Sequence, residues 1–78
     1  MTIKEHDRVV LTDDIGEKRL KAGDVGAVVH IYPGAEAYVV EFLTLDGYTE
    51  AILHVRASQI RPVSKSDITH ARNIDVAV

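Results

Sequence analysis

Histidine is the residue type in this sequence that could most readily bind a metal ion or move a proton, and four histidines occur in 78 residues. His6 and His70 have no recognisable partner nearby in the sequence. His30 and His54 share one face of the sheet predicted below, and their backbones lie two strand spacings, or about 9 to 10 Å, apart. A metal ion bound by both would need a nitrogen of each side chain within about 2.1 Å. Only Glu41 could serve as a third ligand, so no metal site is predicted.

Other chemistry-bearing patterns favour structural roles. No Gly-x-Ser-x-Gly, His-Glu-x-x-His or phosphate-binding loop occurs. The glycine-rich stretch Gly23–Gly26 leads into a predicted strand instead of opening a helix, so it favours a tight turn over a phosphate site. Asp13 and Asp14 are adjacent, which is typical of a solvated loop. We therefore predict no catalytic residue, no cofactor and no enzyme activity.

Charge and hydropathy limit the kinds of partner that this protein can bind. The formal net charge is −3 with a pI near 5.7, whereas binding to phosphate backbones depends on clustered Lys and Arg. The only basic cluster is Lys18, Arg19 and Lys21, interpreted as a solvated loop. No stretch approaches the roughly 18 apolar residues of a membrane span, and the charged first eight residues do not resemble a signal peptide. We expect a cytoplasmic protein with no membrane contact, and the charge argues against nucleic acid as its partner.

Size predicts one domain with one core. Hydrophobic residues make up 46% and charged residues 27%, the balance of a folded chain, and there is no cysteine for a disulfide. Domains this small are marginally stable on their own. We therefore expect oligomerisation or complex formation to add to the stability of this one. We expect a barrel over residues 1–63 and a C-terminal tail over residues 64–78.

Apolar alternation and turn residues define five strands. Their predicted ranges are 8–12, 25–32, 37–44, 48–56 and 60–63. Asp46-Gly47 predicts a two-residue type I′ hairpin turn, and residues 57–59 suggest one helical turn. Together with the long irregular segment 13–24, these elements predict an all-β fold, a small five-stranded SH3-like barrel with a short C-terminal helical or extended tail.

The hairpin turn fixes which side chains face inward. With Leu45 opposite Tyr48 across the turn, the predicted core pairs are Phe42–Ala51, Val40–Leu53 and Tyr38–Val55, and all six of these residues are apolar. The opposite face pairs Leu43 with Glu50, Glu41 with Ile52, and Val39 with His54.

The outer face of the sheet carries an apolar surface where polar side chains are the norm. A four-residue turn over 33–36 would place Tyr32 opposite Ala37, His30 opposite Val39, and Val28 opposite Glu41. Contiguous apolar surface marks contact with another element or molecule. The predicted partner-binding residues on this face are Val28, His30, Tyr32, Val39, Leu43, Ile52 and His54.

The apolar residues of the tail, residues 64–78, are spaced first as in a helix and then as in a strand. Ser66 could cap a short helix over residues 67–72 that carries Ile68, and Ile74, Val76 and Val78 then alternate as in a strand. We add Ile68, Ile74 and Val76 to the partner-binding residues. The tail is expected to cover the outer face or join a sheet edge, its own or a neighbour's; the alternative is a frayed terminus.

Residues 3–63 as a whole resemble a bacterial family of small domains of unknown function that is common in cyanobacteria. The resemblance rests on five segments: residues 7–11, 20–26, 28–34, 37–42 and 57–63. It implies a barrel similar to KOW-type and other SH3-like barrels, without catalytic residues to assign. Some members belong to toxin–antitoxin-like or accessory gene pairs, which implies a neutralising or docking role.

Two functional interpretations remain open. The first is a non-catalytic protein-binding module, antitoxin-like or an accessory subunit, whose partner is a second copy or the product of a neighbouring gene. SH3-like accessory subunits of photosynthetic electron-transfer complexes and of nitrile hydratase use such a barrel for docking. The alternative is a KOW-like RNA- or ribonucleoprotein-binding barrel, although this acidic chain lacks a basic stripe.

Overall fold

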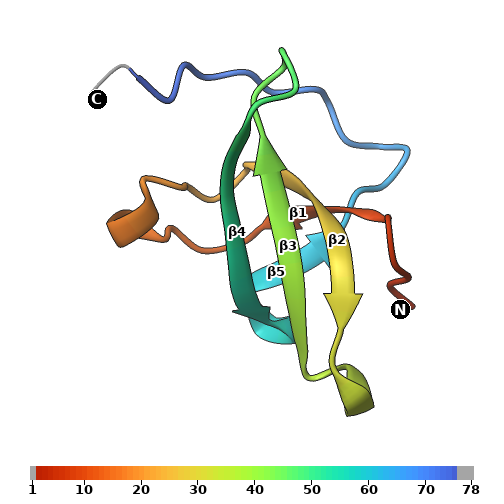
Figure 1. Ribbon diagram of the computed structural model, residues 1–78. Helices are drawn as coiled ribbons and strands as arrows, with labels where there is room; N and C mark the ends of the chain where they lie inside the picture. The colour runs from red at the N-terminus through yellow and green to blue at the C-terminus, as the bar shows by residue number, and fades with distance from the viewer. Residues whose placement is uncertain (1, 76–78) are drawn as a thin grey trace.

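Five antiparallel strands form one strongly bent sheet in the computed structural model, which describes residues 2–75 (Figure 1). The strands are β1 (Arg8–Leu11), β2 (Val25–Ile31), β3 (Ala37–Leu43), β4 (Thr49–Arg56) and β5 (Ile60–Pro62), in the sheet order β4-β3-β2-β1-β5. Short 3₁₀ turns lie at η1 (Gly16–Lys18), η2 (Pro33–Ala35) and η3 (Ala57–Gln59). This confirms the small all-β, barrel-like fold, with every strand within one residue of its predicted bounds.

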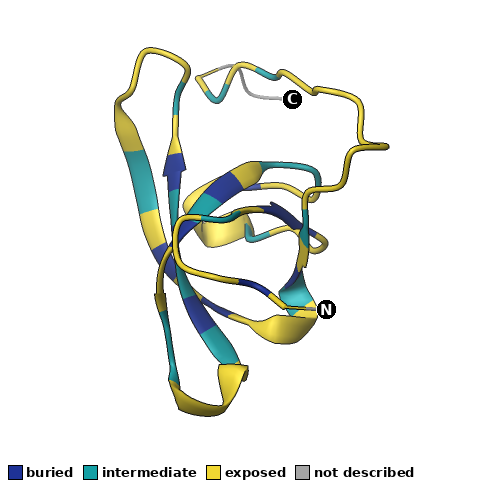
Figure 2. Cartoon of the chain, turned by 90° about the vertical axis from the view of Figure 1, so that its right-hand side faces the viewer, coloured by how far each residue is buried: buried dark blue, intermediate teal, exposed yellow. Residues whose placement is uncertain are grey.

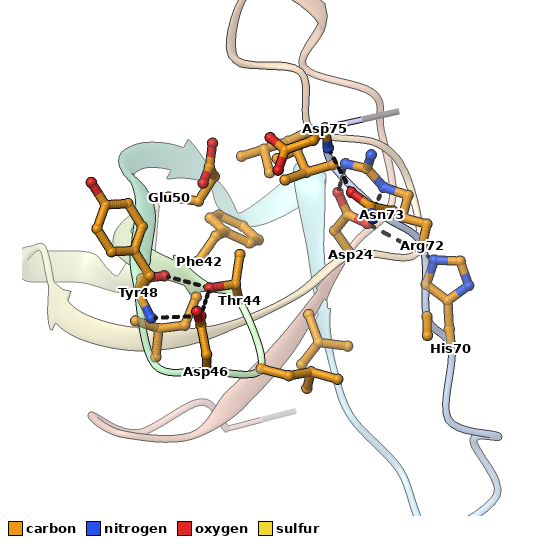
Figure 3. A pocket seen from close by; sticks show the side chains of 16 residues that line it. Asp24, Phe42, Thr44, Asp46, Tyr48, Glu50, His70, Arg72, Asn73 and Asp75 are labelled. Carbon is orange, nitrogen blue, oxygen red and sulfur yellow. Dashed lines mark hydrogen bonds and ion pairs between the residues drawn. The ribbon is translucent and has the colours of Figure 1, made fainter. Parts of the chain in front are cut away.

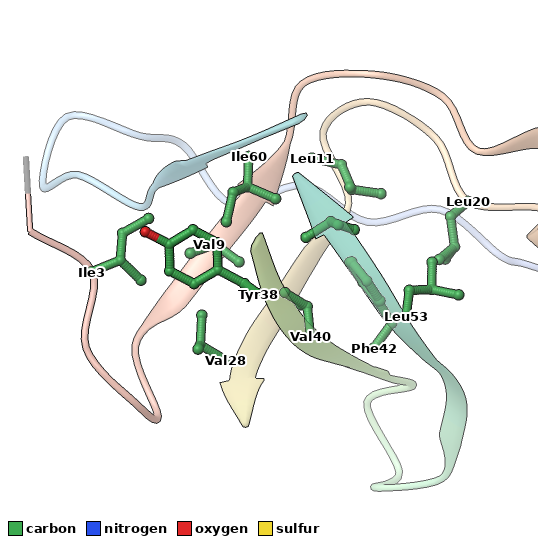
Figure 4. Packing of buried hydrophobic residues seen from close by; sticks show 11 residues of the cluster. Ile3, Val9, Leu11, Leu20, Val28, Tyr38, Val40, Phe42, Leu53 and Ile60 are labelled. Atoms are coloured by element: carbon green, nitrogen blue, oxygen red, sulfur yellow. The ribbon is translucent and has the colours of Figure 1, made fainter. Parts of the chain in front are cut away.

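The core lies on the concave side of the bent sheet and takes side chains from all five strands (Figures 2 and 4). Among the described residues, no polar or charged side chain is buried, so burial of apolar area is the main source of stability. The buried cluster consists of Ile3, Val9, Leu11, Leu20, Val28, Tyr38, Val40, Phe42, Leu53, Val55 and Ile60.

The β3–β4 hairpin has the predicted register over most of its length but a different turn. Phe42 pairs with Ala51 as expected. At the turn, the Thr44 N–H donates to the Tyr48 carbonyl at 2.9 Å, which makes a three-residue loop. Only Gly47 in this loop has positive φ, at 87°, so the predicted type I′ turn is wrong. A bulge at Glu50 offsets the longer loop and restores the register beyond it.

This turn also changes two of the predicted pairs. Leu43 pairs with Thr49 rather than with Glu50. Leu45 was predicted to lie opposite Tyr48, but Tyr48 is bonded to Thr44 instead. The predicted Leu45–Tyr48 pair is wrong because the longer loop includes Leu45, and both side chains are exposed, at 102% and 70%.

A second bulge, in β2, gives Val28 a different partner and a different face from those predicted. His30 pairs with Val39 as expected, but the register shifts between Val28 and His30, so Val28 pairs with Val40. Because one extra residue reverses the side-chain alternation, Val28 points into the core and is 0% exposed. Its predicted place on the outer face is wrong.

The tail is neither helical nor paired in the sheet over residues 64–75. Asp67 accepts a hydrogen bond from the Ser64 N–H at 2.7 Å and two from the Arg61 guanidinium at 2.8 and 2.9 Å. The predicted helix over 67–72 is absent because the Asp67 carboxylate closes a local turn instead. The tail then crosses the end of the barrel near the β3–β4 turn (Figure 1). Val76 and Val78 lie outside the described residues.

No helix within residues 2–75 has both the length and the apolar composition needed to cross a bilayer.

Candidate binding surface

Three ring side chains lie together on the outer face of the β2–β3–β4 meander. Tyr32 Oη lies 2.7 Å from His54 Nδ1. The two rings stack with centroids 5.7 Å apart and planes 28° apart. His30 meets Tyr32 edge-on, with centroids 5.1 Å apart and an angle of 88°. These contacts join β4 to the residue that follows β2 and group the three rings on one face.

The sheet ladder explains this grouping. Val39 pairs with His30 on one side and with His54 on the other, so the three residues form a row across the sheet. Tyr32, in extended backbone two residues after His30, returns to the same face. When His54 is neutral with its proton on Nε2, the Tyr32 hydroxyl donates to Nδ1.

Apolar side chains continue this surface along the strands. Ile52 is 57% exposed and Leu43 is 44% exposed, while Val39 is half-buried. Glu41, paired with Ile52, accepts a hydrogen bond from the Thr49 hydroxyl at 2.7 Å. We call the set His30, Tyr32, Val39, Leu43, Ile52 and His54 the outer face.

The described part of the tail does not cover the outer face. Ile68 is 92% exposed, and Ile74 is half-buried against the core cluster. The structure therefore brings together six of the ten predicted partner-binding residues. Val28 lies in the core, Ile68 and Ile74 lie in the tail, and Val76 lies outside the described residues.

The spacing of the histidines bears on metal binding. Within residues 2–75, no group of three or more His, Asp or Glu side chains lies close enough to hold a metal ion. The outer face offers two imidazoles and a phenol, of which Tyr32 and His54 are hydrogen-bonded to each other. This arrangement suits surface contact better than ion coordination.

A second surface feature, not predicted from the sequence, is an open groove of about 810 Å³ between the β3–β4 turn and residues 70–75 (Figure 3). We call it the tail groove. Its lining combines exposed apolar side chains with carboxylates from the turn and the tail. The sequence signal that could have revealed it was the pair of large apolar residues, Leu45 and Tyr48, flanking Asp46-Gly47.

An ion pair between Asp24 and Arg72 holds one wall of the tail groove in place. The Arg72 guanidinium donates to both carboxylate oxygens of Asp24, from Nε to Oδ1 at 2.8 Å and from Nη2 to Oδ2. Nη2 also donates to the Arg19 carbonyl at 2.8 Å. Burial of Asp24 opposes its ionisation. The hydrogen bonds from Arg72 and from the Lys21 N–H outweigh that effect, so the pKa of Asp24 lies below its ordinary value.

Acid should therefore weaken the folded state. The hydrogen bonds from Arg61 and from the Ser64 N–H lower the pKa of Asp67 to about 2, and the pKa of Asp24 is also lowered. Since the unfolded chain binds more protons in this range, stability is present above about pH 4 and is lost as pH falls towards 2. We expect the urea midpoint of unfolding to decrease between pH 5 and pH 2.

The double variant Asp24→Asn/Asp67→Asn is the test of this assignment, with Asp13→Asn as the matched control at an exposed aspartate. The double variant should show a flatter pH profile than the wild type, and the control should follow the wild type. Equal slopes for all three proteins would contradict the assignment.

A family model described as a domain of unknown function, DUF4926, matches residues 5–62, which span all five strands. No curated protein and no solved structure matches the chain.

Proposed function

Because the chain belongs to the DUF4926 family of domains of unknown function, we propose its function from the surface itself: a non-catalytic protein-binding module that docks on a partner protein through the outer face. The partner is a second copy of the chain or the product of a neighbouring gene. In the second case the protein acts as an antitoxin-like or accessory subunit in the cytoplasm.

The proposal rests mainly on the exposure of Ile52 and Leu43 beside the three ring side chains of the outer face. Burying the exposed half of one such aliphatic side chain contributes about 1 kcal/mol to binding. Tyr32 and His54 already hold each other in place, so a partner that covers them restricts little additional side-chain motion. Apolar and aromatic side chains are enriched at the centres of protein interfaces.

Charge favours a protein over a nucleic acid as the partner. Glu41 is paired with Ile52 of the outer face, and the whole chain has a formal net charge of −3. A phosphate backbone requires a cluster of cations, because its affinity comes from displacing condensed counterions.

Site-specific photocrosslinking tests the proposal. A photoreactive phenylalanine analogue replaces Ile52 in the protein expressed in its native cell. We expect one discrete protein adduct, either a dimer or a complex with a second protein, because position 52 would lie inside the interface.

Position 68 provides the matched control, since Ile68 is also an exposed isoleucine but lies in the tail. The same analogue there should not give this adduct. Excess untagged wild-type protein should compete the adduct away, and excess Ile52→Asp protein should not. Absence of an adduct at position 52, or identical adducts at both positions, would argue against docking through the outer face.

A further inference from the structure

We propose that the tail groove is a second binding site, which takes an extended peptide segment of a partner protein whose Lys or Arg side chains alternate with apolar ones. This inference goes beyond the outer face. It rests on a different surface, with Leu43 alone common to both.

Much of the lining of the tail groove is apolar. Among the described residues, eight large hydrophobic side chains are exposed, and four of these line this one groove: Val25, Leu43, Leu45 and Tyr48. Exposed apolar groups gathered in one concavity are typical of a binding site, whereas single ones scattered over a surface are ordinary. A partner that fills the groove would remove them from water.

The rim of the tail groove is acidic. Asp24, Asp46, Glu50 and Asp75 contribute four carboxylates, and Arg72 is the only Lys or Arg side chain in the lining. Arg72 is paired with Asp24, and Glu50 lies 3.5 Å from the guanidinium of Arg19, outside the lining. Asp46 and Asp75 are therefore the carboxylates that a cationic side chain of a ligand would meet. A hydrogen bond from the Thr44 hydroxyl, with another from the Tyr48 N–H, lowers the pKa of Asp46, so this carboxylate is charged at neutral pH.

This combination specifies the chemistry of the ligand. Successive side chains of an extended peptide point to opposite sides. Alternating apolar and cationic residues can therefore meet the apolar side chains and the carboxylates of the lining at the same time. Anionic ligands, including nucleic acid, are repelled by the same carboxylates.

The groove is largely formed before any ligand arrives. Ion pairs fix the tail at Asp67, through Arg61, and at Arg72, through Asp24. On the opposite wall, the β3–β4 turn is held by the bond from the Thr44 N–H to the Tyr48 carbonyl. A pre-formed site avoids most of the cost of ordering its walls on binding.

Titration of ¹⁵N-labelled full-length protein with the synthetic peptide (Lys-Leu)₄ tests the inference. We expect saturable amide shifts at the groove residues Val25, Leu45 and Asp75, with no shifts at Ile52 and His54 on the outer face. The peptides (Glu-Leu)₄ and (Lys-Ser)₄ separate the contributions of charge and apolar contact, and neither should saturate at the same concentrations.

Two variants, each with a matched control, locate the site. Asp75→Lys should weaken (Lys-Leu)₄ binding by about five- to tenfold, because it replaces an attraction with a repulsion; Glu36→Lys, an exposed site away from the groove, should not. Leu45→Ser, at a side chain that packs on nothing, should also weaken binding, and Ile68→Ser should not.

Three results would overturn the inference: shifts confined to the outer face, no saturable shift with (Lys-Leu)₄, or groove shifts that depend on protein concentration without peptide. The third result would identify a second copy of the chain as the occupant. The crosslink at position 52 is read out on the protein without added peptide, so the two proposals can fail separately.

Discussion

We expect Val28→Asp to unfold the domain and Val29→Asp to leave it folded. Val28 is 0% exposed in the core, and Val29, at the bulge, is 38% exposed. An aspartate at position 28 loses the apolar burial of valine and places a carboxylate where nothing can pair with it, which costs several kcal/mol. A domain of this length has a total stability of only about 4 to 12 kcal/mol.

Far-UV circular dichroism and urea unfolding of the two variants measure this difference. Val28→Asp should lack a cooperative transition at neutral pH, while Val29→Asp should retain one with a midpoint near that of the wild type. The reverse result would show that β2 pairs with β3 without the bulge, and the outer face would then have a different composition.

Gly26→Ala should lower the free energy of unfolding by about 2 to 3 kcal/mol, because the added methyl group would overpack the barrel. A Cβ at position 26 would lie 2.5 Å from Val40 Cγ1, 2.9 Å from Phe42 Cε1 and 2.9 Å from the Glu41 carbonyl oxygen. The carbonyl belongs to the backbone of β3, so relieving this contact requires the strands to separate where the sheet bends.

Thermal unfolding of Gly26→Ala measures this effect. For a domain of this size the expected decrease in Tm is about 10 to 20 °C. Gly16→Ala is the matched control, since nothing lies within 4 Å of the Cβ it would add, and its Tm should change little. If both variants melt at the temperature of the wild type, the close approach of β2 to β3 at Gly26 is wrong.

The sequence predicted the strands well, because alternating apolar residues between turn residues reflect burial on one side of a sheet. It predicted the β3–β4 register from Asp46-Gly47 even though the turn type was wrong, since the bulge at Glu50 compensated for the longer loop. No change in loop length offsets the bulge near Val29, so the side-chain alternation is reversed there and Val28 was assigned to the wrong face. Neither bulge has a glycine or proline to mark it in the sequence.

The candidate surfaces were only partly predictable. The outer face follows from strand alternation, which placed His30, Val39 and His54 in one row. The contact between Tyr32 and His54 depends on where β2 ends relative to β4, which no local pattern specifies. The tail groove arises from the long-range pair Asp24–Arg72, and pairs separated by 48 residues leave no local signal in one sequence.

The dissociation constant of the complex with the crosslinked partner, purified and compared across variants, tests docking through the outer face most directly. We expect Ile52→Asp to weaken binding by about tenfold or more, because a carboxylate would replace an apolar anchor at the interface. Ile68→Asp should leave the dissociation constant unchanged. An Ile52→Asp protein that is folded and binds with wild-type affinity would contradict the proposed function.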